Sequence, residues 1–207
     1  MAPLVPSLPR AGCGRRAHGP RDRSLVRIAL LAIVLVPAAA PAQEREVRVS
    51  AEYDLKAAFL FRFTQFVDWP PEAFAAASTP ITIGVLGADP FGNSLDEIVA
   101  NEVAHNRRLL VRRFRDVEDV DSCQVLFIGS SEAHRQERVL SALDHRSILT
   151  VGETADFTTR SGMIGFVLQG NRLRLSINLS AVRAARLTVS SKLLRQARIV
   201  AGGAPGP

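Results

Sequence analysis

Cysteine is scarce in this 207-residue chain, which contains only Cys13 and Cys123. Two cysteines cannot form a disulfide framework, and neither has the C-x-x-C partner of common metal and redox motifs. The composition is otherwise that of an ordinary globular chain, with 47% hydrophobic and 22% charged residues. Disordered and fibrous classes are therefore excluded.

The apolar run at residues 28–36 is too short to cross a bilayer stably, which takes about 20 residues. It follows an arginine-rich stretch and precedes Ala40-Pro41-Ala42-Gln43. This order is typical of a secretory signal peptide with a small-x-small cleavage site. We therefore predict a signal peptide over residues 1–42, cleaved after Ala42, although a retained anchor is the alternative. A single domain over 43–201 and a disordered tail over 202–207 would remain.

An overall surplus of positive charge is absent once this leader is set aside. Residues 1–42 hold six arginines and one aspartate, which leaves 20 basic and 19 acidic side chains of the 26 and 20 in the whole chain. A surface that neutralises phosphates needs a clustered excess of Lys and Arg. No nucleic-acid partner is therefore expected.

Cys123 is the one cysteine left after cleavage, so in an oxidising compartment it is either buried or paired between chains. Residues 124–128, Gln-Val-Leu-Phe-Ile, are typical of a core strand. Free cysteine is among the most often buried residue types, so we predict that Cys123 is buried.

A helix is predicted over residues 49–69, because this stretch is rich in helix formers and lacks glycine and proline. Pro70 sets its end near Asp68. Seven of the twelve aromatic residues lie between residues 53 and 74, so the helix is buried on more than one side. It is either the central helix of its own domain or one that also packs against a second chain. Four of its aromatic residues recur at helical spacing: Phe59, Phe63, Phe66 and Trp69.

Strands and helices alternate along the rest of the domain. Strands are predicted at 81–86, 109–114, 123–128 and 148–151, and helices at 94–105 and 129–143. The pattern then changes to a hairpin of 163–168 with 172–177, followed by a last helix at 189–200. This order predicts an α/β fold: a mostly parallel, mixed sheet with helices on both faces and a C-terminal β-hairpin and helix.

No catalytic or metal-binding pattern is complete in the sequence. The histidines at 105, 134 and 145 are not paired at helical spacing, and no cysteine or carboxylate cluster completes a zinc pattern. Ser130 and Ser131 follow a strand and open a helix, as a nucleophile would, but the second glycine of G-x-S-x-G is missing. Helix capping explains these serines better. Neither enzyme activity nor a metal or cofactor is predicted.

A weaker hypothesis concerns a small polar ligand. Ligands of parallel α/β sheets bind at the carboxyl ends of strands. Here those ends carry four polar side chains: Asp89, Ser130, Ser131 and Glu153. If the strand order places these loops side by side, a ligand could bind the amides at helix N-termini.

Several motifs, taken together and in order over residues 51–200, resemble the YfiR family of exported bacterial proteins. They are KAAFLFRF at 56–63, FVDWP at 66–70, GVLG at 84–87 with DPF at 89–91, CQVLFI at 123–128, ILTVG at 148–152, GMI at 162–164, RLSIN at 174–178 and SSKLL at 190–194.

This resemblance implies a small periplasmic α/β domain, often dimeric, without known catalysis. Better-understood members restrain an inner-membrane diguanylate cyclase by contacting its periplasmic part, and an outer-membrane lipoprotein can sequester the restrainer. We therefore expect a periplasmic regulator that represses a diguanylate cyclase, and so cyclic-di-GMP synthesis and biofilm, by population shift. The alternative is a small-ligand sensor for a histidine kinase or an outer-membrane receptor.

The expected partner or dimer interface is the aromatic stripe of the first helix. Some family members carry paired cysteines that form disulfides, whereas Cys123 has no partner in the mature chain. Stability is then left to packing alone.

Overall fold

The computed structural model describes residues 40–170 and 172–201. Nearly all of the leader predicted at 1–42 and the whole tail predicted at 202–207 lie outside these residues, so both stay predictions. The compact unit described below starts at Ala42. Among the described residues, no helix combines the length and the apolar character that a membrane span requires.

The described elements are short, apart from the first helix. The α-helices are α1 (Ala40–Phe66), α2 (Ser94–Val99), α3 (Gln136–Ala142), α4 (Leu179–Ala184) and α5 (Ser191–Leu194). The strands are β1 (Val67–Asp68), β2 (Ile81–Leu86), β3 (Val103–Ala104), β4 (Arg107–Phe114), β5 (Val125–Ile128), β6 (Leu149–Gly152), β7 (Ile164–Gln169), β8 (Arg172–Asn178), β9 (Thr188–Val189) and β10 (Ala197–Val200). The 3-10 turns are Pro71–Ala73, Val117–Asp119 and Ser130–Arg135.

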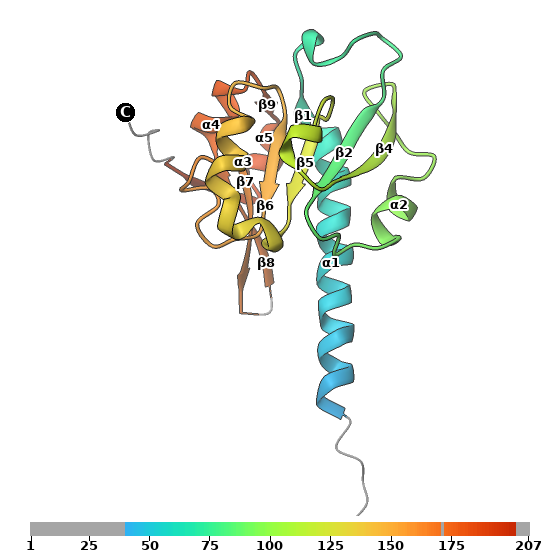
Figure 1. Ribbon diagram of the computed structural model, residues 1–207, viewed down its shortest axis with the longest axis vertical. Coiled ribbons are helices and arrows are strands. Elements are labelled where there is room, and N and C mark those ends of the chain that lie inside the picture. The colour runs from blue at the N-terminus through green and yellow to red at the C-terminus, as the bar shows by residue number, and fades with distance from the viewer. Residues whose placement is uncertain (1–39, 171, 202–207) are drawn as a thin grey trace, which may run out of the picture. The chain divides into compact units, whose positions relative to one another are not determined.

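An eight-stranded sheet runs in the order β10-β8-β7-β6-β5-β2-β4-β3, and a two-stranded sheet joins β1 to β9 (Figure 1). Five neighbouring strands of this sheet are parallel: β4, β2, β5, β6 and β7. Strand β8 is antiparallel to β7, and β3 is antiparallel to β4. If the parallel strands β2, β4, β5, β6 and β7 are numbered 1 to 5 along the chain, their order in the sheet is 2-1-3-4-5. The order reverses between β2 and β5, which is where open α/β sheets bind ligands.

Strand β5 shows how the sheet separates two cores. Successive side chains of a strand point to opposite faces. Val125 and Phe127 belong to the cluster that α1, α2, α4 and α5 cover, whereas Leu126 and Ile128 belong to the cluster under α3. Every residue of β5 is buried, as a strand covered on both faces requires. The predicted fold class is confirmed.

Two predicted helices end earlier than expected because backbone pairing competes with the helix. Helix α1 stops at Phe66, two residues before the predicted end, since the next two residues pair with β9 and the Ser190 amide donates to the Phe66 carbonyl at 2.8 Å. The helix predicted at 94–105 stops at Val99. Beyond it β3 and β4 form a hairpin whose turn residues, His105 and Asn106, have φ of 49° and 61°.

The last predicted helix, 189–200, is wrong in its second half. Ser190 caps a helix of only four residues, α5, with its Oγ accepting from the Lys192 amide at 3.3 Å. Ala197–Val200 then extends the sheet as β10, in parallel with β8. The apolar spacing of this stretch fits a helix, but its β-branched end joins the sheet edge.

The prediction that Cys123 is buried is confirmed. Its side chain is 3% exposed, and its Sγ lies 2.8 Å from the Val125 carbonyl. Burial raises the pKa of this thiol to about 12. Buried thiols of high pKa are chemically inert, so Cys123 acts as a small core residue.

Candidate functional site

The four aromatic residues predicted as an interface do not share one exposed face. Phe63 is fully buried and stacks on Phe166 of β7, with ring centroids 6.1 Å apart. Trp69 follows the helix, is half-buried, and donates its indole Nε1 hydrogen to the Gln124 carbonyl at 3.0 Å. Phe63 is therefore a core residue of its own domain.

Phe59 and Phe66 lie instead on the flank of α1, half-buried against the sheet. With Arg62 between them they face α5, and the three residues line a shallow groove whose other wall is Lys192, Leu193 and Gln196. Leu55 lies one turn before Phe59 and is 47% exposed. By their spacing, Leu55, Phe59, Arg62 and Phe66 lie along one side of α1.

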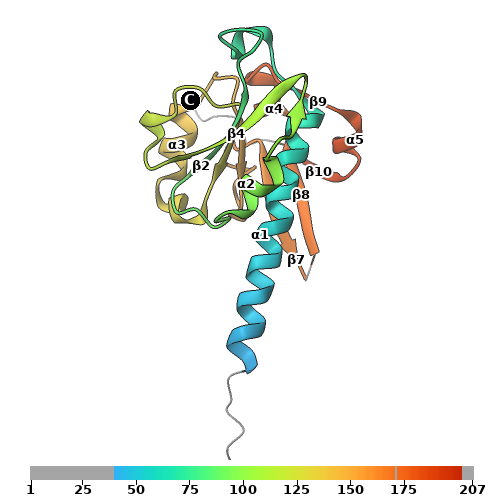
Figure 2. The same cartoon turned by 90° about the vertical axis from the view of Figure 1, so that its right-hand side faces the viewer.

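The N-terminal half of α1 extends beyond the edge of the sheet (Figures 1 and 2). Residues 48–51 are all exposed, including Val49 at 47%, and from Glu46 onward, Val47 apart, the first buried side chains are Lys56 and Ala57. At 1.5 Å per residue the stretch before Lys56 is roughly 20 Å long. A helix of this length is marginal without tertiary contacts, so a partner would stabilise it.

A buried ion pair joins α1 to the carboxyl end of β6. The Lys56 Nζ lies 2.6 Å from an oxygen of Glu153, and the exposed fractions of the two side chains are 4% and 8%. Glu52 provides a second carboxylate at 2.6 Å, and the Ser130 amide donates to Glu153 at 3.0 Å. Tyr53 completes the cluster, donating its hydroxyl to Glu153 at 3.4 Å. We call these five residues the Lys56 cluster.

The electrostatics of this cluster favour a charged lysine. Burial by itself would lower the pKa of Lys56, but hydrogen bonds to Glu153 and Glu52 reverse that effect and raise it above the ordinary value. Burial, assisted by the charge of Glu153, raises the pKa of Tyr53. Lys56 is thus charged at neutral pH, with a neutral tyrosine beside it.

The four residues predicted to bind a ligand are partly brought together. Ser130 and Glu153 share a hydrogen bond, and the Ser131 Oγ accepts from the Ala88 amide at 3.0 Å. Asp89 lies on the loop after β2, but it accepts from the Phe91 amide at 2.8 Å and from the Arg113 guanidinium at 2.9 Å. These polar atoms are therefore bonded within the chain.

Buried polar side chains are hydrogen-bonded in the part of the chain that the structure describes. No buried side-chain nitrogen or oxygen there lacks a partner. Within the same residues, no three His, Cys, Asp or Glu side chains gather in a way that could hold a metal ion.

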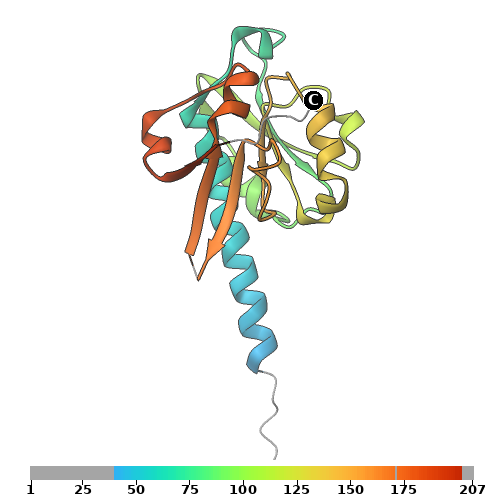
Figure 3. The same cartoon turned by 90° about the vertical axis from the view of Figure 1, so that its left-hand side faces the viewer.

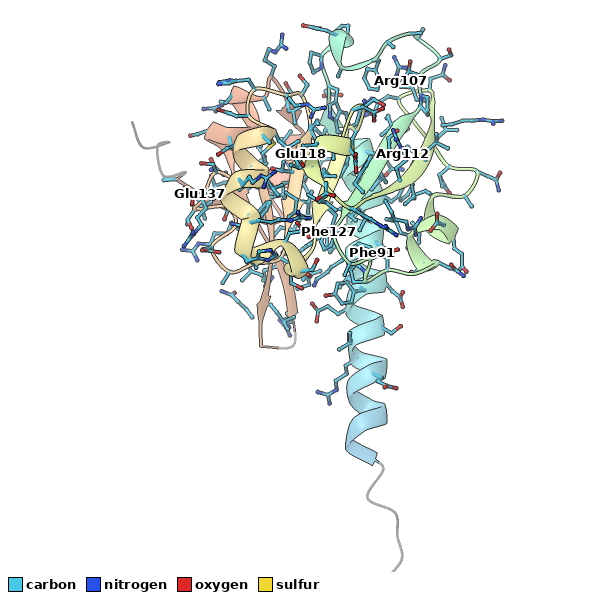
Figure 4. The ribbon with its side chains drawn as sticks, in the orientation of Figure 1. Phe91, Arg107, Arg112, Glu118, Phe127 and Glu137 are labelled. Atoms are coloured by element: carbon cyan, nitrogen blue, oxygen red, sulfur yellow. The ribbon has the colours of Figure 1, made fainter. Side chains whose placement is uncertain are left out.

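Phe91 and Phe127, labelled in Figure 4, fill the space between α1 and the sheet, with ring centroids 4.8 Å apart.

Lys56 is the buried, ion-paired side chain of the candidate site that the sequence did not single out. It lies four residues before Leu60 and seven before Phe63, on the face of α1 that turns to the core. A charged residue at such a position needs a buried partner. That spacing was the available signal, but the sequence does not say which of the many carboxylates pairs with it.

Comparisons with known proteins concern nearly the whole described domain. The family model described as YfiR/HmsC-like matches residues 53–198. No curated protein matches the chain.

Solved structures resemble the chain only distantly. One is a Streptococcus pneumoniae ABC domain in complex with L-Trp, at 10% identity and a TM-score of 0.44, over 58% of this chain and 55% of that one. Another is a conserved domain protein from Vibrio cholerae O1 biovar El Tor, at 17% identity and a TM-score of 0.40, over 57% and 54%. This chain thus spans little more than half the length of the structures it matches.

Proposed function

The chain belongs to the YfiR/HmsC-like family, and from this premise we propose that it is a periplasmic regulator that controls an inner-membrane signalling protein by direct contact. The proposed partner is the periplasmic part of a diguanylate cyclase, which the contact represses. An outer-membrane lipoprotein would compete for the regulator, and a second copy of the chain would form a homodimer.

The observation that carries this proposal is the exposed apolar surface of α1. Val49 and Leu55 are each 47% exposed, and the flanking Phe59 and Phe66 are only half-buried. Full burial of such side chains contributes about 1.5 to 3 kcal/mol each, so covering what remains exposed would contribute about 3 kcal/mol in total. Apolar surface on a protruding helix fits a helix-in-groove contact.

Repression would follow from a difference in affinity between two states of the partner. A regulator shifts a conformational equilibrium only by its differential binding free energy. About 3 kcal/mol, if realised in one state alone, shifts that equilibrium by about a hundred-fold. The α1 surface is large enough for such a shift without any catalytic residue.

The experiment is a crosslinking pull-down from the periplasm with Leu55→Asp. Leu55 is half exposed, so the charge leaves the fold intact but places an unpaired carboxylate in the proposed contact. Leu110→Asp on β4 is the matched control, since Leu110 is 48% exposed on another element. The proposal predicts that Leu55→Asp no longer captures the membrane signalling protein, whereas Leu110→Asp still does. Equal capture by both variants would reject the proposal.

A ligand sensor feeding a kinase or receptor is the second candidate. The loops that carry Ser131 and Glu153 lie at the carboxyl edge of the sheet, next to the point where strand order reverses. A ligand there would have to replace the hydrogen bonds that Glu153 and Ser131 already make. A cyclase gene beside this one would favour the first candidate, and a kinase or receptor gene would favour the second.

A further inference from the structure

Charge is separated along the domain, although its net charge is close to zero. Residues 163–207 contain seven basic side chains and no Asp or Glu. All nineteen acidic side chains that follow the leader lie in residues 43–162, beside thirteen basic ones. The first part therefore carries a net charge of −6 and the second a net charge of +7.

The two parts also differ in how their cations are paired. On β4, Arg112 binds Asp121 at 2.8 Å and Arg113 binds Asp89 at 2.9 Å (Arg112 is labelled in Figure 4). In the C-terminal part Arg186 pairs with Glu72. Over the described ranges 40–170 and 172–201, the other six cations are exposed and have no carboxylate partner: Arg172, Arg174, Arg183, Lys192, Arg195 and Arg198.

Three of these cations share one face of the sheet. Arg172 and Arg174 alternate along β8 and so lie about 7 Å apart on the same side. On β10, the last strand of the sheet, Arg198 is the register partner of Ser176, which places it on that side too. Lys192 and Arg195 lie on and just after α5, immediately before β10. We call these five residues the basic edge: Arg172, Arg174, Lys192, Arg195 and Arg198. Figure 2 labels β8, α5 and β10, on or next to which they lie.

Exposed aliphatic side chains lie on the same strands, or next to them, but on the other face of the sheet. Ile199 lies next to Arg198 on β10 and is 47% exposed. Leu168 is 57% exposed on β7, close to the end of the β7–β8 hairpin, which projects beyond the rest of the sheet (Figure 3). Leu168 pairs with Leu173 and Ile199 pairs with Ile177, so both side chains point to the sheet face opposite to that of Arg172, Arg174 and Arg198. A surface that meets the open side of β10 therefore contacts cations from one face and Ile199 from the other, which is the mixed character of a surface that rests on a membrane.

We propose that the basic edge binds the anionic phosphate surface of a phospholipid bilayer. Its guanidinium groups form an open row, which suits an extended array of phosphates. A second copy would bring like charges together across the edge strands, which disfavours pairing there. An acidic polypeptide bound on the arginine face would satisfy the charges but would leave Ile199, which lies on the edge strand and points to the opposite face, exposed.

The test is co-sedimentation of protein purified from cells that express the full 207-residue chain. The vesicles are phosphatidylcholine alone or phosphatidylcholine mixed with phosphatidylglycerol, at low salt and at about 1 M salt, where the Debye length falls to about 3 Å. The variant is R172Q/R174Q. The control is R108Q/R115Q, which removes the same charge at two exposed arginines outside the basic edge. Circular dichroism and thermal unfolding check that both variants fold.

Binding should require phosphatidylglycerol and be lost at high salt. A cation near an anionic membrane contributes about 1 kcal/mol, which is about fivefold in affinity, so R172Q/R174Q should bind about twenty-five-fold more weakly than the control. Equal binding to both vesicle types, or equal weakening in both variants, would overturn the proposal. So would binding to a polyglutamate peptide in preference to the vesicles, which would indicate an acidic protein partner. The assay contains no signalling protein, so its outcome is independent of the proposed α1 contact.

Discussion

Replacing Lys56 by methionine should be one of the most damaging single changes at the candidate site. The substitution keeps the length and apolar stem of the side chain but removes the cation between two carboxylates, each 2.6 Å away. Glu153, 8% exposed, would then be a buried charge without a counterion. Removing one partner of a buried pair costs about 3 to 5 kcal/mol. We expect a loss of this size in the free energy of unfolding at pH 7.

The assay is urea unfolding followed by circular dichroism, with two further variants. Lys56→Met combined with Glu153→Gln removes both charges, so it should recover the larger part of the loss. Arg138→Met is the control: it breaks the pair with Glu118, whose side chains are 70% and 58% exposed, and should change stability little. If Lys56→Met is no more destabilising than Arg138→Met, the Lys56 cluster does not anchor α1.

The pH dependence of the free energy of unfolding tests whether charged Lys56 stabilises the fold. The folded-state pKa of Lys56 lies above its ordinary value of 10.5, so its contribution is fully present below pH 10.5 and is lost as the pH rises further. Lys56→Met lacks this titrating group, so its stability should not show this loss. The difference in the free energy of unfolding between wild type and Lys56→Met should therefore shrink as the pH rises above about 10.5.

Two other predictions concern the core. Phe63→Ala should lower the free energy of unfolding by about 3 to 5 kcal/mol, because the ring is fully buried. Phe66→Ala should lower it clearly less, because Phe66 is only half-buried. A similar loss in the two variants, measured by thermal unfolding, would contradict the division of the aromatic residues between core and flank. Cys123 should not react with a thiol reagent at pH 8 in the folded protein and should react fully in urea, because burial raises its pKa to about 12; labelling in the folded state would show that the thiol is accessible.

Local sequence patterns predicted much of the sheet. The run at 81–86 matches β2 without change, and the hairpin predicted at 163–168 and 172–177 matches β7 and β8 within one residue. These elements are recognisable because each is a continuous apolar or alternating run bounded by a turn residue. The two-sided burial expected for the aromatic helix holds for its C-terminal half, from Lys56 to Phe66.

Long-range pairing accounts for most of what could not be predicted. Residues 197–200 become a strand only because β8 offers a free edge, and β1 forms only because β9 lies beside it. The same holds at the candidate site, since Lys56 and Glu153 are 97 residues apart. Spacing along one helix placed Phe59, Phe63 and Phe66 on α1, but only the folded structure shows that Phe63 is fully buried while Phe59 and Phe66 are half-buried.

The measurement that tests the proposed function most directly is the cellular level of cyclic-di-GMP in a strain whose only copy of this gene carries Leu55→Asp. The variant protein must first be found in the periplasm at its normal amount. Repression through α1 predicts that cyclic-di-GMP rises to the level of a strain that lacks the gene, while Leu110→Asp leaves it unchanged. A wild-type level of cyclic-di-GMP with Leu55→Asp would contradict it.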